Sequence, residues 1–269
     1  MNKKMKILRH IVIVVLFSLF SLQASGISVD AGLTPGQDRW MIRTQYRFME
    51  MENPMMTMQN HMVPMVLAYG VSSNFTLMFR SVYVNRIVKM NKNVQNEGLN
   101  DAYFLLKLKV FRRNTAKYII GVAPYIASNI PIGNPDISKR TWNPDFGLSI
   151  SYRPRPWSID FASSYSFIDV LNKTDIDERN NLSLNIALSS VVPIKNSDLA
   201  FSPVLELTYN TELGDGIKNQ ELLFLSPGLM FIKSSVIIEL LYQNPIFQQA
   251  NESLIKAKPR FLLGLRYMF

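Results

Sequence analysis

Methionine is concentrated in one stretch of 25 residues near the beginning of the chain, together with a histidine. Eight of the fourteen methionines lie there: Met41, Met49, Met51, Met55, Met56, Met58, Met62 and Met65. Thioether sulfur is a soft ligand suited to Cu(I), and an imidazole can complete such a site. A candidate site for copper or silver capture is therefore formed by Met51, Met55, Met56, Met58, His61 and Met62. Two other interpretations remain open, namely an adaptable apolar lining for hydrophobic ligands and a loop packed into a cavity mouth.

Other common site chemistries are excluded by composition. The chain has no cysteine, so disulfides and thiol nucleophiles are ruled out. One of its two histidines, His10, lies in the predicted leader described below, so a multi-histidine metal centre is excluded as well. A serine hydrolase needs a histidine base within hydrogen-bond reach of its nucleophile, and His61 lies among methionines instead. We expect no enzymatic activity and no cofactor, apart from the Cu(I) alternative.

The first 26 residues predict a secretory signal peptide. Residues 1–9 are basic, residues 11–22 are mostly apolar, and Ala24-Ser25-Gly26 places small residues before a cleavage point at Ile27. The apolar run is too short to cross about 30 Å of hydrocarbon. The formal charge is 29 − 20 = +9, and the leader carries four of the basic residues, so the mature chain has 25 − 20 = +5. That excess is too mild to indicate nucleic-acid binding.

The remaining chain, residues 27–269, alternates between apolar and polar residues with a period of two. Phe261, Leu263 and Leu265, for example, alternate with Leu262, Gly264 and Arg266. This pattern is typical of strands with one apolar face. Twelve strands are predicted, at about 38–48, 62–70, 74–86, 99–112, 117–129, 143–153, 157–168, 179–192, 198–210, 220–232, 234–244 and 257–269.

The connections between these strands alternate in length along the whole chain. Short links such as 70–73 and 154–156 alternate with long ones. The long links are 49–61, 87–98, 130–142, 169–178, 211–219 and 245–256. Short periplasmic turns and long outer loops are typical of outer-membrane barrels. The sequence therefore predicts an all-β fold, a transmembrane antiparallel β-barrel of about twelve strands, as a single domain in the outer membrane of a Gram-negative bacterium. Its partners are then the lipid bilayer and, through the C-terminal aromatic Phe269, the barrel-assembly machinery.

If the apolar rows face lipid, the opposite rows face the lumen. The predicted lumen residues are Arg43, Gln45, Arg47, Arg80, Arg86, Lys107, Lys109, Asp160, Asn181, Asn185, Glu206, Glu239, Arg260 and Arg266. These charges either line a conducting path or pair with one another and close it. Only about ten mature residues precede the first strand, so we expect no substantial N-terminal plug.

Several motifs resemble a known family. Gly98-Leu99-Asn100-Asp101 before a long strand is similar to a Gly-Leu-Gly-Asp turn, and Pro131-Ile132-Gly133 to a Pro-Thr-Gly turn, of the "MetA-pathway of phenol degradation" family of outer-membrane transporters. Trp40-Met41, the run Tyr46 to Met51, and Tyr69 to Ser72 resemble its methionine-rich members. The resemblance covers roughly residues 38–150 and implies uptake of hydrophobic or aromatic compounds.

The function predicted from the sequence is passive uptake of small molecules, hydrophobic or aromatic ones among them. No phosphate-binding loop or energy-coupling motif is visible, so transport would follow a gradient. The alternatives are a copper-binding surface protein that uses the methionine-rich loop and, less favoured, a barrel enzyme. No nucleic-acid partner is expected.

Overall fold

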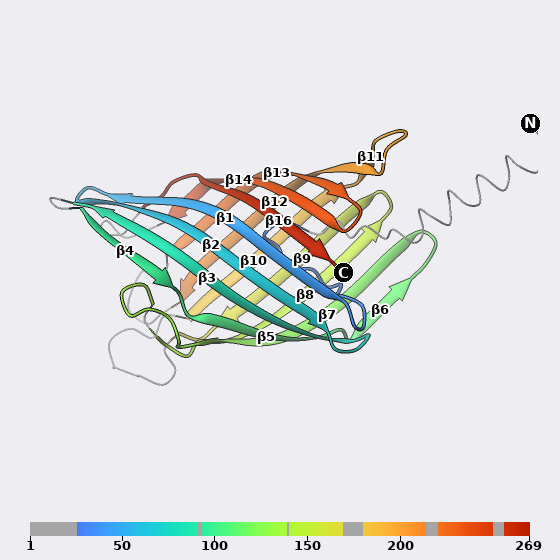
Figure 1. Cartoon of the computed structure of the whole chain (residues 1–269), viewed down its shortest axis with the longest axis horizontal. Helices are drawn as coiled ribbons and strands as arrows, with labels where there is room; N and C mark the ends of the chain where they lie inside the picture. Colours follow the sequence, from blue (N-terminus) through green and yellow to red (C-terminus); the bar gives the residue numbers. More distant parts are fainter. Residues whose placement is uncertain (1–25, 91–92, 139, 169–179, 214–219, 250–255) are drawn as a thin grey trace, which may run out of the picture.

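The chain forms one closed antiparallel barrel (Figure 1). The computed structural model describes residues 26–90, 93–138, 140–168, 180–213, 220–249 and 256–269. The predicted leader thus lies outside the described residues except for Gly26. The strands are β1 (Trp40–Asn53), β2 (Met56–Gly70), β3 (Phe75–Lys89), β4 (Val94–Leu99), β5 (Ala102–Leu108), β6 (Phe111–Asn114), β7 (Tyr118–Ile130), β8 (Pro144–Pro154), β9 (Trp157–Ser166), β10 (Asn180–Ser190), β11 (Val192–Pro193), β12 (Leu199–Leu213), β13 (Glu221–Lys233), β14 (Val236–Gln249), β15 (Lys256–Ala257) and β16 (Arg260–Met268).

These sixteen segments make twelve complete strands of the barrel wall, here called staves, because some segments are successive parts of one interrupted strand. β4, β5 and β6 follow one another between β3 and β7, and β10–β11 and β15–β16 are likewise continuous courses. Each stave pairs with its neighbours in the chain, and β1 pairs with β16 from Met41↔Met268 to Phe48↔Phe261. β10 and β12 are joined in the same way. The predicted twelve-strand barrel is confirmed.

The alternation of the sequence becomes an outer and an inner face. In β16, Phe261, Leu263 and Leu265 are exposed, whereas Leu262 and Arg266, on the opposite face, are buried. The exposed rows form an apolar outer surface that matches hydrocarbon, and ring closure gives each stave a hydrogen-bonded neighbour on both sides. This architecture is that of an outer-membrane protein of Gram-negative bacteria. The described residues contain no helix with the length and hydropathy needed to cross a membrane.

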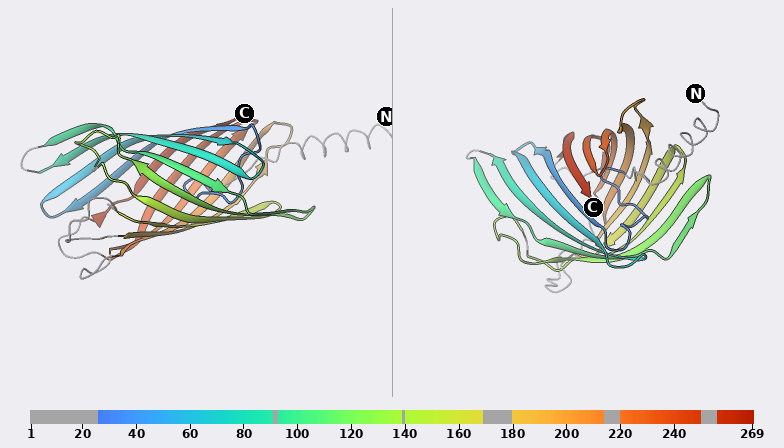
Figure 2. Two further views of the ribbon diagram at one scale, coloured as in Figure 1. Left: turned by 90° about the horizontal axis from the view of Figure 1, so that it is seen from below. Right: turned by 45° about the vertical axis from the view of Figure 1, so that its right-hand side comes forward.

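The two ends of the barrel differ. The short turns and the C-terminus lie at one end, here called the turn end, and the tips of the β1–β2 and β3–β4 hairpins lie at the other, the loop end (Figures 1 and 2). The prediction of a loop at 49–61 is wrong, because β1 runs to Asn53 and β2 begins at Met56. The link 87–98 is similarly shortened by β3 and β4. Strand pairing continues beyond the apolar band, where no lipid imposes the alternation that the sequence pattern detects.

The interior of the turn end holds a segment that was not expected. Residues 26–37 precede β1 and fold back into the barrel, where Ile27 and Val29 are buried. This segment, residues 26–37, is called the plug below. The expectation that no substantial N-terminal plug is present is therefore wrong. A stretch of about ten residues suffices because the lumen of a twelve-stranded barrel is narrow.

A charge introduced on the outer face tests the lipid contact. Replacing Leu263, near the middle of β16, by Arg should destabilise the barrel by about 2–4 kcal/mol, because a guanidinium would enter hydrocarbon. The control Val236→Arg, beside the turn between β13 and β14, should cost at most about 1 kcal/mol. Urea unfolding in lipid vesicles measures both, and equal costs at the two positions would contradict the orientation described here.

Candidate functional site

The plug is held by an apolar contact at its beginning. Ile27 is 0% exposed and lies in a cluster with residues of β12, β13, β14 and β16. The members are Ile27, Ala200, Val204, Met230, Ile232, Ile237, Leu241 and Leu262. A Cβ on Gly228 would come within 3.0 Å of Ile27 Cδ1, so the missing side chain there makes room for isoleucine.

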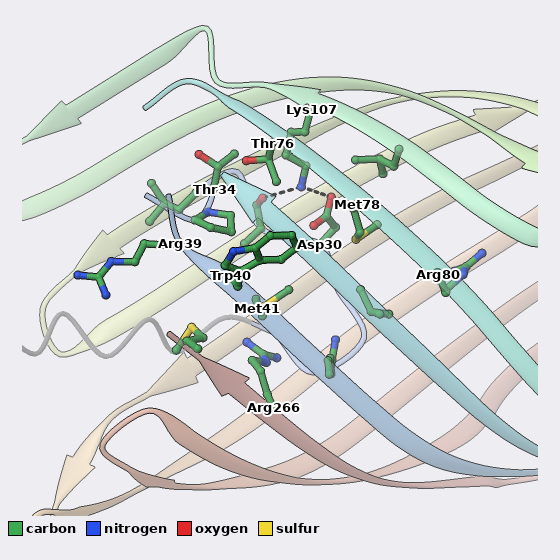
Figure 3. Close-up of a pocket in the computed structure, with 18 of the residues that line it drawn as sticks. Asp30, Thr34, Arg39, Trp40, Met41, Thr76, Met78, Arg80, Lys107 and Arg266 are labelled. Carbon is green, nitrogen blue, oxygen red and sulfur yellow. Dashed lines mark hydrogen bonds and ion pairs between the residues drawn. The ribbon is translucent and has the colours of Figure 1, made fainter. Parts of the chain in front are cut away.

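Polar contacts fix the rest of the plug to the opposite wall. The Gly32 amide donates to Ser151 Oγ at 3.0 Å, and Ser149 Oγ donates to Asp30 Oδ2 at 3.0 Å. Lys107 forms an ion pair with Asp30, which is drawn in Figure 3. Lys109 reaches the plug at Thr34 Oγ1 (3.4 Å) and also binds the Ser73 carbonyl. The two predicted lumen lysines therefore hold the plug in place.

A second group of predicted lumen residues forms a compact ionic network at one side of the plug. Glu239 is buried and accepts from Arg43 Nη2 at 2.7 Å, while Arg266 Nη2 lies 2.5 Å from its other oxygen. Gln45 Nε2 donates to the same carboxylate at 3.0 Å. Gly264 lies beneath this group, where a Cβ would be 2.7 Å from Glu239 Oε2. These contacts satisfy charges that would be costly to bury alone.

Two further predicted acids lie at the same level on neighbouring strands. Asp160 of β9 and Glu206 of β12 are both paired in register with Ala187 of β10, which lies between them. Asp160 accepts from Ser151 and from the Gly26 amide (3.2 Å), and Arg153 Nη2 lies 3.8 Å away. Glu206 accepts from the amides of Ile27 and Ser28 and from the Ser28 hydroxyl.

The remaining predicted lumen cations have neutral partners. Arg47 donates to Gln45 Oε1 at 2.6 Å and Arg86 to Asn60 Oδ1 at 3.1 Å. Arg80 stacks on Tyr103 at 4.3 Å, and Arg260 on Phe224 at 4.2 Å. In the part of the chain that the structure describes, none of these four arginines forms an ion pair. Asn185 lies apart from these groups and donates to Ser183 Oγ at 3.0 Å.

A cavity of about 550 Å³ remains between the plug and the wall formed by β1, β2, β3 and β5. Its charged lining is mainly basic, with one acid, Asp30, and six basic residues, Arg39, Arg43, Arg47, Arg80, Lys107 and Arg266. Its apolar lining includes Met41, Met78 and Leu105. Figure 3 shows the labelled basic and methionine side chains around the same space. A small molecule with both apolar and anionic parts matches this lining.

The methionine-rich segment is a β-hairpin, and its two faces separate the predicted metal ligands. Met51 pairs in register with Met58, and Met49, Met56 and Met62 share the inward face of the hairpin with them. These five residues are called the thioether face below. His61 is on the outward face, where Tyr46 Oη lies 2.7 Å from its Nδ1 and its ring is 5.1 Å from that of Phe48. Met55 is exposed in the turn.

The structure thus does not bring His61 together with Met56, Met58 and Met62, because strand residues of odd and even number point to opposite sides. In the described residues, no group of three or more His, Cys, Asp and Glu is arranged to hold a metal ion. A site made only of thioether sulfur lies outside that statement.

Comparison with known proteins gives a fold relationship. No family model and no curated protein matches the chain. The COG4313 outer membrane channel from Pseudomonas putida F1 is similar in structure, with a TM-score of 0.63 and 14% identity over 92% of this chain and 100% of that one. The β-domain of the Bordetella autotransporter BrkA has a TM-score of 0.54 and 10% identity over 87% of this chain and all of that one. The barrel fold is shared, and the identities are too low to transfer a function.

The plug was missed because the sequence pattern was applied to strands only. Residues 27–36 contain a signal that could have found it: Ile27, Val29 and Leu33 are apolar, although they lie outside any strand. Gly32 is a second signal, since the plug backbone lies directly against β7 and β8 there. A Cβ on Gly32 would lie 2.6 Å from the Gly121 carbonyl oxygen and 2.7 Å from the Ser151 amide.

Substitution of Gly32 tests the seating of the plug. Gly32→Ala should destabilise the seated position of the plug by about 1–3 kcal/mol, because the added methyl group has no space. The population with the plug displaced should then rise roughly 5- to 150-fold. Gly36→Ala is the matched control, because its Cβ would meet only Arg39 Cγ at 3.6 Å. Thermolysin cleavage of residues 27–36 in the folded barrel measures the effect. A cleavage rate equal to that of the control would contradict the close packing.

Proposed function

We propose that the barrel is a passive channel for small molecules, hydrophobic or aromatic compounds with an anionic group among them. The observation that carries this proposal is the cavity of about 550 Å³ left beside the plug. Its size lies within the range of about 300–1,000 Å³ usual for small-ligand sites. Its basic and apolar lining suits a molecule such as an aromatic carboxylate.

The distribution of charge supports a preference for anions. The carboxylates among the predicted lumen residues are engaged by the plug or by Arg43, Arg153 and Arg266, whereas Arg47, Arg80, Arg86 and Arg260 have neutral partners. The Nε atoms of Arg80 and Arg260 are buried and without a hydrogen-bond partner among the described atoms. Positive charge in a narrow lumen concentrates anions there.

The resemblance to the phenol-degradation family of outer-membrane transporters supports the proposed class of substrate, and the similar COG4313 protein is itself a channel. Insertion would depend on the barrel-assembly machinery, with exposed Phe269 as its recognition residue; the Phe269 ring stacks on Tyr267 at 5.4 Å. We propose no catalytic role, because His61, the histidine of the described residues, contacts Tyr46 and Phe48 rather than a serine.

Electrical recording tests the channel and its charge preference together. Purified protein in planar bilayers should conduct, and the reversal potential in a salt gradient should show anions favoured. Changing Arg47, Arg86 and Arg260 together to Gln should move the permeability ratio toward one, because the lumen loses three positive charges. The control Lys195→Gln/Lys233→Gln removes exposed charges at the turn end. A silent barrel, or one that prefers cations, would contradict the proposal.

A second candidate function is the capture of Cu(I) or Ag(I) at the loop end. The observation that favours it is the thioether face, since Met51 and Met58 are direct cross-strand neighbours and three more methionines flank them. Directly opposite residues have Cβ atoms about 4.5–5.5 Å apart, which lets two flexible side chains share one ion. His61 has no part in this version of the site. The same face would also serve as an adaptable lining for hydrophobic solutes.

A titration with Ag(I) or Cu(I) tests this candidate. Met51→Leu/Met58→Leu keeps the volume and removes the two sulfur atoms, so affinity should fall on the order of tenfold or more. Met55→Leu and His61→Ala should leave the affinity unchanged, since Met55 is exposed in the turn and His61 is on the outward face. If all three variants bind as the unmodified protein does, the methionines serve as lining only.

A further inference from the structure

The beginning of the plug lies on a seat made by two buried carboxylates. Asp160 and Glu206 are each 0% exposed, and Ala187 separates them in register across β9, β10 and β12. Gly26 lies directly on Ala187, because a Cβ at Gly26 would be 2.8 Å from Ala187 Cβ and 3.1 Å from Glu206 Oε1. The main chain at Gly26 and Ile27 therefore passes between two negative groups.

Glu206 is bound entirely by the plug. Its Oε1 accepts from the Ile27 amide and, at 3.0 Å, from the Ser28 amide. Its Oε2 accepts from the Ser28 hydroxyl and, at 3.2 Å, from the Ser28 amide. These are all neutral donors, so the carboxylate is hydrogen-bonded without being neutralised.

Glu206 differs in this respect from the other acids around the plug. Asp30 has Lys107, Asp160 has Arg153 at 3.8 Å, and Glu239 has both Arg43 and Arg266. Among the residues that the structure describes, no lysine, arginine or histidine forms an ion pair with Glu206. Arg43 is close enough for its charge to act on Glu206 through space, but its hydrogen bonds go to Glu239 and to the Ile27 carbonyl. A buried carboxylate that no cation contacts directly is only partly compensated, and an uncompensated buried charge is destabilising.

The missing cation is available from the chain itself. The leader predicted from the sequence ends at Gly26, and its removal exposes the nitrogen of Ile27, the atom that already donates to Glu206. In that hydrolysis the hydroxyl of water goes to the Gly26 carbonyl carbon and the hydrogen to the Ile27 nitrogen. The new amine then takes a proton from solvent and becomes an α-ammonium group.

We propose that the α-ammonium group of Ile27, created by removal of the leader, is the counter-ion of Glu206 and locks the plug in the lumen. This rests on the predicted leader and not on the transport function. The ammonium group has three hydrogens where the peptide amide has one, and departure of Gly26 uncovers the side facing Asp160. Burial of the Ile27 side chain in its apolar cluster holds the nitrogen in place. Charge-assisted hydrogen bonds are roughly twice as strong as neutral ones.

The decisive comparison uses two forms of the full barrel refolded into detergent. One begins at Ile27, and the other carries Gly-Ser-Gly before Ile27, which moves the ammonium group away from Glu206. Each form is prepared with Glu206 and with Glu206→Gln, because glutamine keeps an acceptor for the amides and removes the charge. Asp198→Asn, at an exposed turn, is the control for loss of an acid elsewhere. The rate of thermolysin cleavage within residues 27–36 reports release of the plug.

We expect the form that begins at Ile27 to be cleaved about tenfold more slowly than the extended form, since an ionic hydrogen bond exceeds a neutral one by about that factor. Glu206→Gln should abolish this difference and change the extended form by less than about twofold. An equal effect of Glu206→Gln in both forms would overturn the proposal, because Glu206 would then act through the amides alone. If a Glu206→Gln form does not fold, the two forms with Glu206 still decide, and equal cleavage rates overturn it.

Protein isolated from outer membranes supplies an independent test. Its intact mass should correspond to a chain that begins at Ile27, and any residue retained before Ile27 would overturn the proposal. The α-amine should also react more slowly with an amine-reactive ester than it does in the extended form. An ordinary α-amine has a lower pKa than lysine, so a reagent used near neutral pH labels it selectively. Both readouts are independent of conductance, so a silent barrel would leave them intact.

Discussion

Closure of the hydrogen-bonded ring is the constraint on which the whole structure depends. Hydrocarbon offers no partner for a backbone amide or carbonyl, so every strand must have a neighbour on both sides. Here β1 meets β16, and β10 meets β12, without a gap in the ring. Once the ring is closed, alternation along each strand leaves a polar row inside, and the contents of the lumen follow from that row.

At the turn end, the polar row and the plug satisfy each other. The wall supplies Ser149, Ser151, Asp160 and Glu206, and the plug supplies amides, the Ser28 hydroxyl and Asp30. Because the contacts come from β5, β8, β9 and β12 as well as from the apolar cluster, the plug joins staves on opposite sides of the barrel. A short segment can thereby fill part of the lumen and leave a cavity of about 550 Å³ beside it.

Toward the loop end the interior has a different character. Four arginines there have neutral partners, and the β1–β2 hairpin presents five methionines on its inward face. The lining therefore changes along the barrel axis, from apolar thioether side chains at the loop end to positively charged side chains nearer the plug. If the proposed channel function holds, a solute with an apolar body and a negative group would find complementary surfaces at the thioether face and in the cavity beside the plug.

The sequence by itself determined the class of fold, the number of staves and, within the apolar band, the two faces of strands such as β16. The period-two pattern of segments such as 257–269 is sufficient for this, because lipid on one side forces every second residue to be apolar. It was least informative beyond the membrane, where β1 and β2 continue through Met49 to His61 without that constraint. The pattern therefore predicts a longer loop than the structure has, and it does not separate His61 from the methionines on the opposite face.

Only the tertiary structure decided which charges meet and what fills the lumen. Arg43, Glu239 and Arg266 come from strands far apart in the chain, and their contact depends on ring closure between β1 and β16. Plug residues 26–37 have no periodic pattern, since their conformation is set by partners on five or more strands rather than by their own spacing. Alternation along a strand is a local pattern, because each residue faces either lipid or the lumen. Pairing across the lumen joins residues that are distant in sequence, so it depends on closure of the barrel and leaves no local pattern.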